Sequence, residues 1–294
     1  MDGQQRLAER FEAHRSHLRA VAHRMLGSSG EAEDAVQETW LKLSRSDVSA
    51  VGNLAAWLQT VVSRVCLDML RARATRREDL AGERLPERAQ DADGGTDPER
   101  EALLADSVGR ALLVVLDRLT PAERVAFVLH DTFAVPFDRI APIVDRSPVT
   151  AKKLASRARR KVRGTAAVPA AELARQRRVV DAFLAAARSG DMDAILAVLA
   201  PDAVRRADAA AVPPGTATEA CGARRVAEGV AVFGRRARYA EAALVDGAVG
   251  VVVAPYGRLL FALAFTVEGD RVAAYEVLAD PARLQRLELA VLDA

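Results

Sequence analysis

The most distinctive chemistry in the sequence is a run of positive charge near its middle. Residues 150–164 carry seven lysines and arginines and no acid. On a helix, one face of this run is apolar and holds Ala151, Leu154, Ala155, Ala158 and Val162. Because like charges along a helix repel one another, a partner of opposite charge is expected. Phosphates and base edges of duplex DNA meet that requirement, and a solvated basic helix is the weaker alternative.

A second candidate helix begins at Asn53, a good cap residue, and is expected to run to about Arg73. Its core stripe comprises Leu58, Val62, Val65 and Met69. Beside that stripe lie Trp57, Arg64, Asp68 and Arg71. Bases of single-stranded DNA stack on aromatic rings, and arginine neutralises phosphate. The alternative, which these residues taken alone slightly favour, is an ordinary amphipathic helix with Trp57 in the core.

Charge and composition narrow the class of protein further. Residues 31–38 carry four acids and no base, whereas residues 71–77 carry four arginines. One acidic helix and two basic patches indicate more than one macromolecular partner. The 294 residues are 50% hydrophobic and 28% charged, which predicts two or three folded domains. No stretch suits a membrane span or signal peptide, and Cys66 and Cys221 form no disulfide framework, so we expect a cytoplasmic protein.

Enzymatic readings find little support. The four histidines (His14, His17, His23 and His130) all precede residue 165. No cysteine and histidine spacing suits a metal, and no phosphate-binding loop or nucleophile elbow is present. Acids such as Asp202, Asp208 and Glu276 are isolated. We therefore expect no catalytic residue, no metal and no cofactor.

Turn signals divide the chain into segments. Gly27–Gly30 ends a first helix, and another follows from about Glu31. Residues 79–100 lack periodicity and predict a linker. The run Thr120-Pro121-Ala122-Glu123 predicts a capping box. A short helix over 137–144, containing an awkward Pro142, a turn at Asp145-Arg146 and a basic helix from Pro148 to Gly164 predict a helix-turn-helix.

The remainder has a different pattern. Residues 165–171 predict a second linker, and helices are expected near 172–188 and 191–199. Strand-like runs follow at 248–254, 259–267 and 272–278, with a turn at 268–270. These features predict an α+β domain with an antiparallel sheet. The apolar runs 249–253 and 259–267 are expected to fill its core, with a lined pocket as the alternative.

Three motifs in order resemble bacterial extracytoplasmic-function (ECF) RNA polymerase sigma factors. They are Met25-Leu26-Gly27 with Ala32–Leu41, Ala56-Trp57-Leu58 with Arg64 to Arg71, and Leu119–Leu129 with Ser156–Arg160. The whole architecture is similar to the ECF41-type subgroup with a fused SnoaL-like, NTF2-like domain. The fold class expected is multidomain, with two all-α sigma domains, the second a helix-turn-helix, followed by an α+β cone. The expected boundaries are 1–78 (region 2), 79–105 (linker), 106–164 (region 4), 165–171 (linker) and 172–294 (cone).

The resemblance implies a role for each surface. The acidic helix would bind the clamp of the largest subunit of core RNA polymerase through Asp34, Gln37 and Glu38. The melted −10 strand would contact Asn53, Trp57, Arg64, Asp68 and Arg71. The −35 element of promoter DNA would contact Lys152, Lys153, Ser156, Arg157 and Arg160. The cone would act in cis on the sigma domains, in place of a separate anti-sigma protein.

The sequence departs from the subgroup where interdomain contacts are implied. A linker motif reads Arg84-Leu85-Pro86-Glu87-Arg88, without its usual tryptophan, and a glycine-rich motif reads Asp208-Ala209-Ala210-Ala211. A terminal segment reads Asp280-Pro281-Ala282-Arg283-Leu284. The resemblance implies interdomain regulatory roles for Leu85, Pro86, Glu87, Asp208, Asp280, Pro281 and Leu284. Replacing glycine with alanine removes access to positive φ and so predicts altered contacts.

Two other functions remain open from the sequence. The cone could be a small-molecule sensor attached to a sigma factor. Alternatively, the chain could be a one-component helix-turn-helix regulator that binds operators without polymerase, which leaves the acidic helix and the Trp57 face unused. A fused hydrolase or isomerase ranks last, because no catalytic set is present.

Overall fold

A computed structural model describes residues 2–46, 51–80 and 109–292 of the chain. The contacts divide it into two compact units, Met1–Arg88 with Asp117–Arg160, and Ala89–Leu116 with Lys161–Ala294. In the described part of the chain, no helix has the length and apolar character needed to cross a membrane. The segment containing Leu85, Pro86 and Glu87, most of the expected linker, lies outside the described residues.

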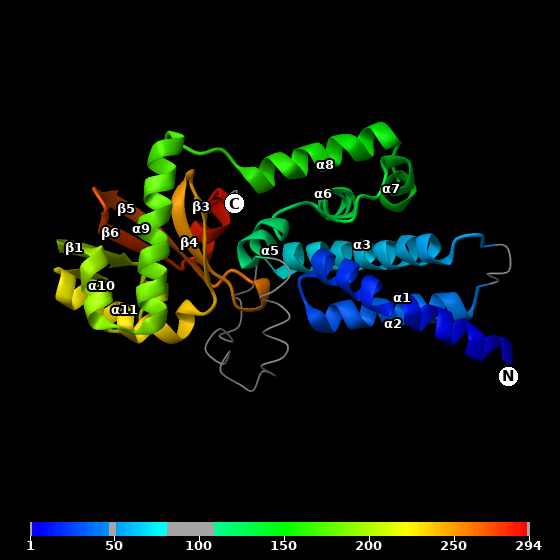
Figure 1. Cartoon of the computed structure of the whole chain (residues 1–294), viewed down its shortest axis with the longest axis horizontal. Coiled ribbons are helices and arrows are strands. Elements are labelled where there is room, and N and C mark those ends of the chain that lie inside the picture. The colour runs from blue at the N-terminus through cyan, green and yellow to red at the C-terminus, as the bar shows by residue number, and fades with distance from the viewer. Residues whose placement is uncertain (1, 47–50, 81–108, 293–294) are drawn as a thin grey trace. The chain divides into compact units, whose positions relative to one another are not determined.

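The first unit opens with three helices that pack on one another (Figure 1). They are α1 (Asp2–Leu26), α2 (Ser29–Ser44) and α3 (Leu54–Leu80). Ser28 caps α2, its hydroxyl accepting from the amide of Glu31, and Asn53 caps α3 by accepting from the amide of Ala56 at 2.9 Å. The expected stripe of α3 is buried at Leu58, Val62 and Val65, whereas Met69 is only partly covered.

The same unit continues with α6 (Pro121–Phe127), a π-helical turn (Val128–Thr132), α7 (Phe137–Val144) and most of α8 (Pro148–Arg163). The capping box predicted at Thr120 is confirmed, because its side chain accepts from the amide of Glu123 and Glu123 accepts from the amide of Thr120. Asp145 ends α7 with φ at 55°, in the left-handed region that glycine usually occupies. The helix-turn-helix predicted over 137–163 is present.

The second unit is an α+β structure with a seven-stranded sheet in the order β2-β1-β6-β5-β4-β3-β7. Its strands are β1 (Leu199–Ala207), β2 (Glu219–Cys221), β3 (Ala240–Val245), β4 (Ala248–Val253), β5 (Phe261–Glu268), β6 (Arg271–Leu278) and β7 (Leu289–Ala290). Its helices include α9 (Ala170–Ser189), α10 (Met192–Val198), α11 (Ala223–Ala237) and α12 (Pro281–Arg286). The helices α9, α10 and α11 lie against the sheet (Figure 1).

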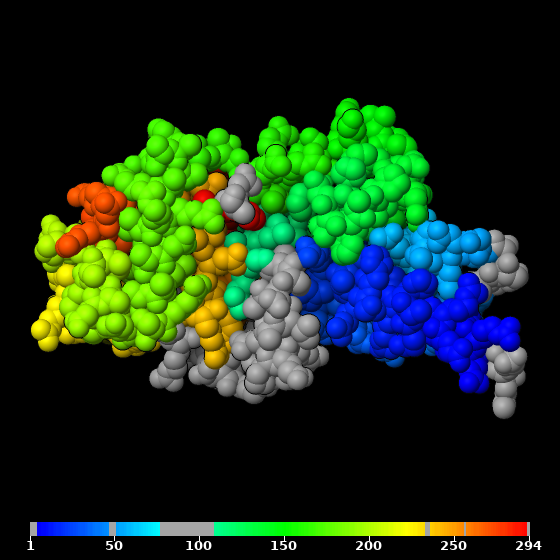
Figure 2. Space-filling view, viewed as in Figure 1, coloured from blue at the N-terminus to red at the C-terminus, as the bar shows by residue number. Residues whose placement is uncertain are grey.

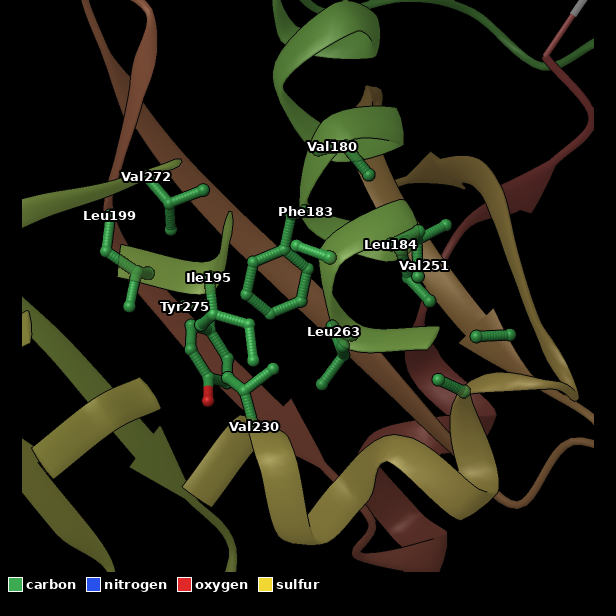
Figure 3. Packing of buried hydrophobic residues seen from close by; sticks show 14 of the residues in the cluster. Val180, Phe183, Leu184, Ile195, Leu199, Val230, Val251, Leu263, Val272 and Tyr275 are labelled. Carbon is green, nitrogen blue, oxygen red and sulfur yellow. The ribbon is translucent and has the colours of Figure 1, made fainter. Parts of the chain in front are cut away.

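The core of the second unit forms between α9 and one face of the sheet. Figure 3 shows Phe183 of α9 between Leu263 of β5 and Tyr275 of β6, with Val230 of α11 beside them. The Phe183 ring lies 5.5 Å from that of Tyr275 and 5.1 Å from that of Phe265. Such tilted aromatic pairs add to the hydrophobic stabilisation from burial. The apolar runs expected to fill a core do so at Val249, Val251 and Leu263.

The structure corrects three expectations. The helix expected to end near Arg73 continues to Leu80, where good helix formers such as alanine and arginine prolong it. The sheet is mixed rather than antiparallel, because β1 pairs with β6 in the parallel sense. Alternation along a strand indicates its buried face but not its partner, and β1 and β6 are joined only through several intervening elements. The strands β1, β2, β3 and β7 and the helix α11 were not predicted.

A short helix from the expected region 4 packs in the second unit. This helix, α5 (Arg110–Leu116), contacts β3, β7 and the turn Pro255–Gly257. The amide of Ala111 donates to Oε2 of Glu241 on β3 at 3.1 Å. Leu113 is buried beside Gly257, where a Cβ atom would meet its Cδ1 at 3.0 Å. Residues 110–116 are therefore held by the cone domain.

Candidate nucleic-acid interface

The helix α8 presents a basic outer face. Ala151, Leu154, Ala155 and Ala158 are buried as the pattern predicts, and Val162 is 8% exposed. The candidate DNA contacts Lys152, Lys153, Ser156, Arg157 and Arg160 are all exposed. In the described residues, Lys152, Lys153 and Arg160 have no hydrogen bond or ion pair. Their charges are therefore available to phosphates and base edges.

Two cations of α8 instead attach the helix to its own unit. Arg159 forms an ion pair with Asp131 at 2.7 Å, and the hydrogen bond to that carboxylate raises the arginine pKa. Arg157 lies 3.6 Å from the buried carboxylate of Glu123, so this candidate DNA contact also has a structural partner. Ser147 precedes α8 and caps it, because its hydroxyl accepts from the amide of Thr150 at 3.3 Å. These contacts set the orientation of the basic face.

The second candidate surface lies on α3. Trp57 is half-buried, while Arg64, Asp68 and Arg71 are exposed. Arg71 lies 3.6 Å from Asp68 one turn earlier, an exposed pair that contributes little to stability. An aromatic ring that is partly covered and flanked by arginine suits stacking against an unpaired base. Asn53 precedes this face as the α3 cap, so its side-chain oxygen is already in use.

The helix α7 lies against part of this α3 surface within the first unit. Nη2 of Arg64 donates to the carbonyl of Pro142 at 3.1 Å. Nη2 of Arg139, on α7, donates to the carbonyl of Ala56 on α3 at 3.1 Å. Pro142 has no amide hydrogen, so α7 lacks one backbone donor at this position. The carbonyl of Pro142 accepts from Arg64 of α3. Sequence reasoning missed Arg139, because nothing local indicates a contact with a residue 83 positions away.

The acids of α2 divide into internal and outward-facing groups. Glu31 pairs with Arg73 of α3, and Glu33 pairs with Arg15 of α1. Asp34, Gln37 and Glu38 are exposed, and no ion pair links them to another helix among the described residues. The space-filling view shows the residues of the first helices, in blue, at the surface of the face that it draws (Figure 2). The outward group, Asp34, Gln37 and Glu38, forms an acidic patch, in which Glu38 pairs with Lys42 of its own helix at 3.2 Å.

The structure brings together the candidate regulatory residues of the second unit. Asp208 accepts hydrogen bonds from the amides of Ala279 and Asp280, each at 2.9 Å. It also accepts from Arg283, which pairs with Glu276 at 2.8 Å. Asp280 caps α12, where Pro281 is exposed and Leu284 is half-buried. Ala209–Ala211 form a 3-10 turn without positive φ, so alanine is accommodated there.

A pH-dependent contribution to stability follows from the Asp208 cluster. Burial opposes ionisation of Asp208, but hydrogen bonds from Asp280, Ala279 and Arg283 outweigh it and hold its pKa below the usual 3.8. A depressed folded-state pKa stabilises the protein above the unfolded-state pKa, and that stability is lost as pH falls through the folded value. We expect Asp208→Asn to lower the melting temperature at pH 7 by several degrees.

The difference in melting temperature between the two proteins should begin to shrink below about pH 4, because the unfolded wild-type chain then takes up a proton at position 208. The difference should disappear only below the lower pKa of the folded carboxyl. Melting curves of both proteins between pH 3 and pH 7 measure this. The exposed residue Asp202 offers a matched control, because Asp202→Asn should leave the curve unchanged. If the two melting temperatures differed by the same amount at every pH, the effect of Asp208 would come from packing rather than from its charge.

No group of three or more histidine, cysteine, aspartate or glutamate side chains in the described ranges could hold a metal ion. The candidate surfaces consist of charged and aromatic side chains on α2, α3 and α8. The fold and these surfaces define a helical DNA-binding protein carrying an α+β domain.

Comparisons with known proteins agree with this class. Residues 10–76 match Sigma-70 region 2, and residues 109–162 match Sigma-70, region 4. The chain is 38% identical to the ECF RNA polymerase sigma factor SigJ of Mycobacterium tuberculosis, over 83% of this chain and 80% of that protein. It is 35% identical to a probable ECF RNA polymerase sigma factor, SigI, of the same organism, over 94% of each.

Among solved structures, the chain is similar to the crystal structure of M. tuberculosis SigJ. The match has 35% sequence identity and a TM-score of 0.45, and it covers 95% of this chain and 98% of that one. The chain belongs to the ECF RNA polymerase sigma factors. It is accordingly an initiation factor that binds RNA polymerase and directs promoter-specific transcription.

Proposed function

We propose that three surfaces of the chain divide the work of initiation. The acidic patch of α2 contacts the clamp of core polymerase, and its charge suits a basic partner. The α3 face around Trp57 holds the melted −10 strand, where stacking offsets part of the cost of unpairing bases. The exposed face of α8 reads the −35 duplex. The work takes place in the cytoplasm, with polymerase and promoter DNA as partners, and the chain itself supplies no catalysis.

We further propose that the domain from residue 172 onward regulates the sigma regions in cis. The single observation that supports this is the position of α5. Residues 109–162 match region 4, yet α5 packs against β3 and β7 of the second unit. Its first turn is held by Glu241, and Leu113, Val114 and Leu116 are buried there. By holding part of region 4, the cone restrains the helices that read DNA. In this way it lowers promoter-specific transcription.

Weakening the hold on α5 tests this proposal. Glu241→Ala removes the carboxylate that accepts from the amide of Ala111, a charged hydrogen bond of a kind that contributes about 1.5–3 kcal/mol. We expect promoter-specific run-off transcription by the full chain with core polymerase to rise about threefold or more. The matched control is Glu268→Ala, which removes an exposed carboxylate from β5 of the same sheet.

Unchanged transcription by Glu241→Ala would contradict coupling through α5. A fall would show that the second unit is a required partner rather than an inhibitor. Comparing residues 1–294 with residues 1–168 in the same assay separates these outcomes, because truncation removes the sheet entirely. The alternative, a one-component regulator, accounts for the basic helix α8 but not for residues 10–76. Those residues match Sigma-70 region 2, which argues against this alternative.

A further inference from the structure

The second unit contains a cavity of about 630 Å³. This volume falls in the range of sites that bind small organic molecules, roughly 300–1,000 Å³. Its walls come from the sheet, from α9 and α11, and from the segment after β1. Phe183, Val230, Val253, Phe261 and Leu263 supply much of its apolar surface. A cavity with this lining is suited to a ring system or an acyl chain.

The polar part of the lining carries charge of one sign. Three arginines, Arg205, Arg236 and Arg238, line the cavity. Among the described residues that line it, none is an aspartate or glutamate. Arg236 and Arg238 are exposed, and Arg205 is half-buried. The planar donors of a guanidinium fit a carboxylate with two parallel hydrogen bonds. The cavity therefore favours a negatively charged guest.

Of the three arginines, Arg205 is the best placed to contact an anionic guest. It lies on β1 directly opposite Tyr275 of β6 in the parallel ladder. Nη2 of Arg205 donates to the carbonyl of Ala217 at 3.0 Å, which fixes the guanidinium. Nε of Arg205 is buried and has no hydrogen-bond partner in the described part of the chain. A guanidinium that lines the cavity, is held through one nitrogen and has no ion pair in the described part of the chain is preorganised to receive an anion.

Tyr275 supplies a second donor next to Arg205. Its side chain is 6% exposed, and the residue lines the cavity. Figure 3 shows its hydroxyl pointing away from the sheet toward Val230 of α11. Burial raises the pKa of Tyr275, so the phenol keeps its proton at neutral pH. A neutral phenol can donate to an anion that a tyrosinate would repel.

We propose that this cavity binds an organic monocarboxylate whose apolar body fills the space between α9, α11 and the sheet, and whose carboxylate meets Arg205 and Tyr275. An inorganic anion would leave the apolar walls unfilled, and a neutral hydrocarbon would leave the guanidinium unpaired. If these residues only filled a hydrophobic core, Leu263 and Phe261 would be explained. An arginine that lines the cavity, Arg205, would not be explained. The site is independent of the cis regulation proposed above.

Calorimetric titration of the full chain tests the site with defined probes. Octanoate and 3-phenylpropionate are the carboxylate probes, and octanamide and 3-phenylpropanamide are their neutral matches. We expect at least one carboxylate to bind about tenfold or more tightly than its amide. Arg205→Gln should remove that preference and weaken carboxylate binding about tenfold, leaving amide binding nearly unchanged.

The matched control is Arg206→Gln. Arg206 is the next residue of β1, so its side chain points to the opposite face, where it is exposed and lies 3.7 Å from Glu219. This variant should bind carboxylates like the wild type. An equal loss in both variants would attribute the effect to overall charge and overturn the assignment.

A second variant, Gly229→Leu, keeps the proposal testable if Arg205→Gln does not fold. Gly229 of α11 lines the cavity, and a Cβ atom placed there meets nothing within 4 Å. Gly229→Leu should keep the fold, raise helix propensity and weaken carboxylate binding by intruding on the space. Absence of binding by every probe to the folded wild-type chain, or unaltered binding by Arg205→Gln, would overturn the proposal.

Discussion

Transcription from a −35-dependent promoter falls about 10- to 100-fold when Lys152 and Lys153 of α8 are both replaced by alanine. This is the expected result if the exposed face of α8 contacts phosphate and base edges. Both side chains are exposed and without partners in the described residues, so their removal costs little stability, and alanine favours the helix. The slope of log affinity against log salt should fall by about two, because each lost phosphate contact lowers it by roughly one.

Two measurements make this prediction specific. Affinity for core polymerase should be unchanged, because the α2 patch is intact. Arg224→Ala with Arg225→Ala removes the same charge from exposed positions of α11 and should leave transcription unaltered. Lys152 and Lys153 are preferable to Arg157, since removing Arg157 also takes a partner from the buried Glu123. Parallel loss of polymerase binding and transcription would contradict the assignment of α8 to DNA.

We expect the affinity for core polymerase to fall about 10- to 100-fold when Asp34 and Gln37 are both replaced by alanine. Interface positions with this effect are few and carry most of the binding energy. Because the internal acids Glu31 and Glu33 keep their arginine partners, the three-helix packing should survive. Binding of the full chain to purified core polymerase, measured at several salt concentrations, tests the prediction.

The matched control for the α2 patch is on α1. Gln5→Ala with Glu9→Ala removes one amide and one carboxylate from exposed positions one turn apart. This pair should leave polymerase affinity unchanged. If it weakened binding as much as Asp34→Ala with Gln37→Ala, the interaction would depend on net charge rather than on a defined patch. Unaltered binding by the α2 variant would place the polymerase contact elsewhere.

Local patterns predicted the elements that carry the surfaces. The capping box at Thr120 satisfies amide groups within four residues, and the buried stripe of α8 follows from helical period alone. The exposed sides of α2, α3 and α8 follow from the same period. The order of the motifs and of the helical and strand-like segments along the chain was likewise enough to identify two sigma regions and a later α+β domain. These features depend on interactions between residues close in sequence.

Features that depend on long-range contacts could not be predicted in this way. The parallel pairing of β1 with β6 sets Arg205 beside Tyr275, although 70 residues separate them in sequence. The packing of α5 on β3 depends on a bond between Ala111 and Glu241, residues 130 positions apart. A single sequence shows which face of an element is apolar, but not which other apolar face covers it.

The sequence by itself therefore determined the class of protein, its helical surfaces and the residues exposed on them. Only the tertiary structure decided which of those residues are already engaged. It assigned Glu31 and Glu33 to arginines of neighbouring helices, Arg64 to the carbonyl of Pro142, and α5 to the cone. The physical reason is that the helical period and helix caps are properties of a few neighbouring residues, whereas pairing and packing are shared by elements that meet only when the chain folds.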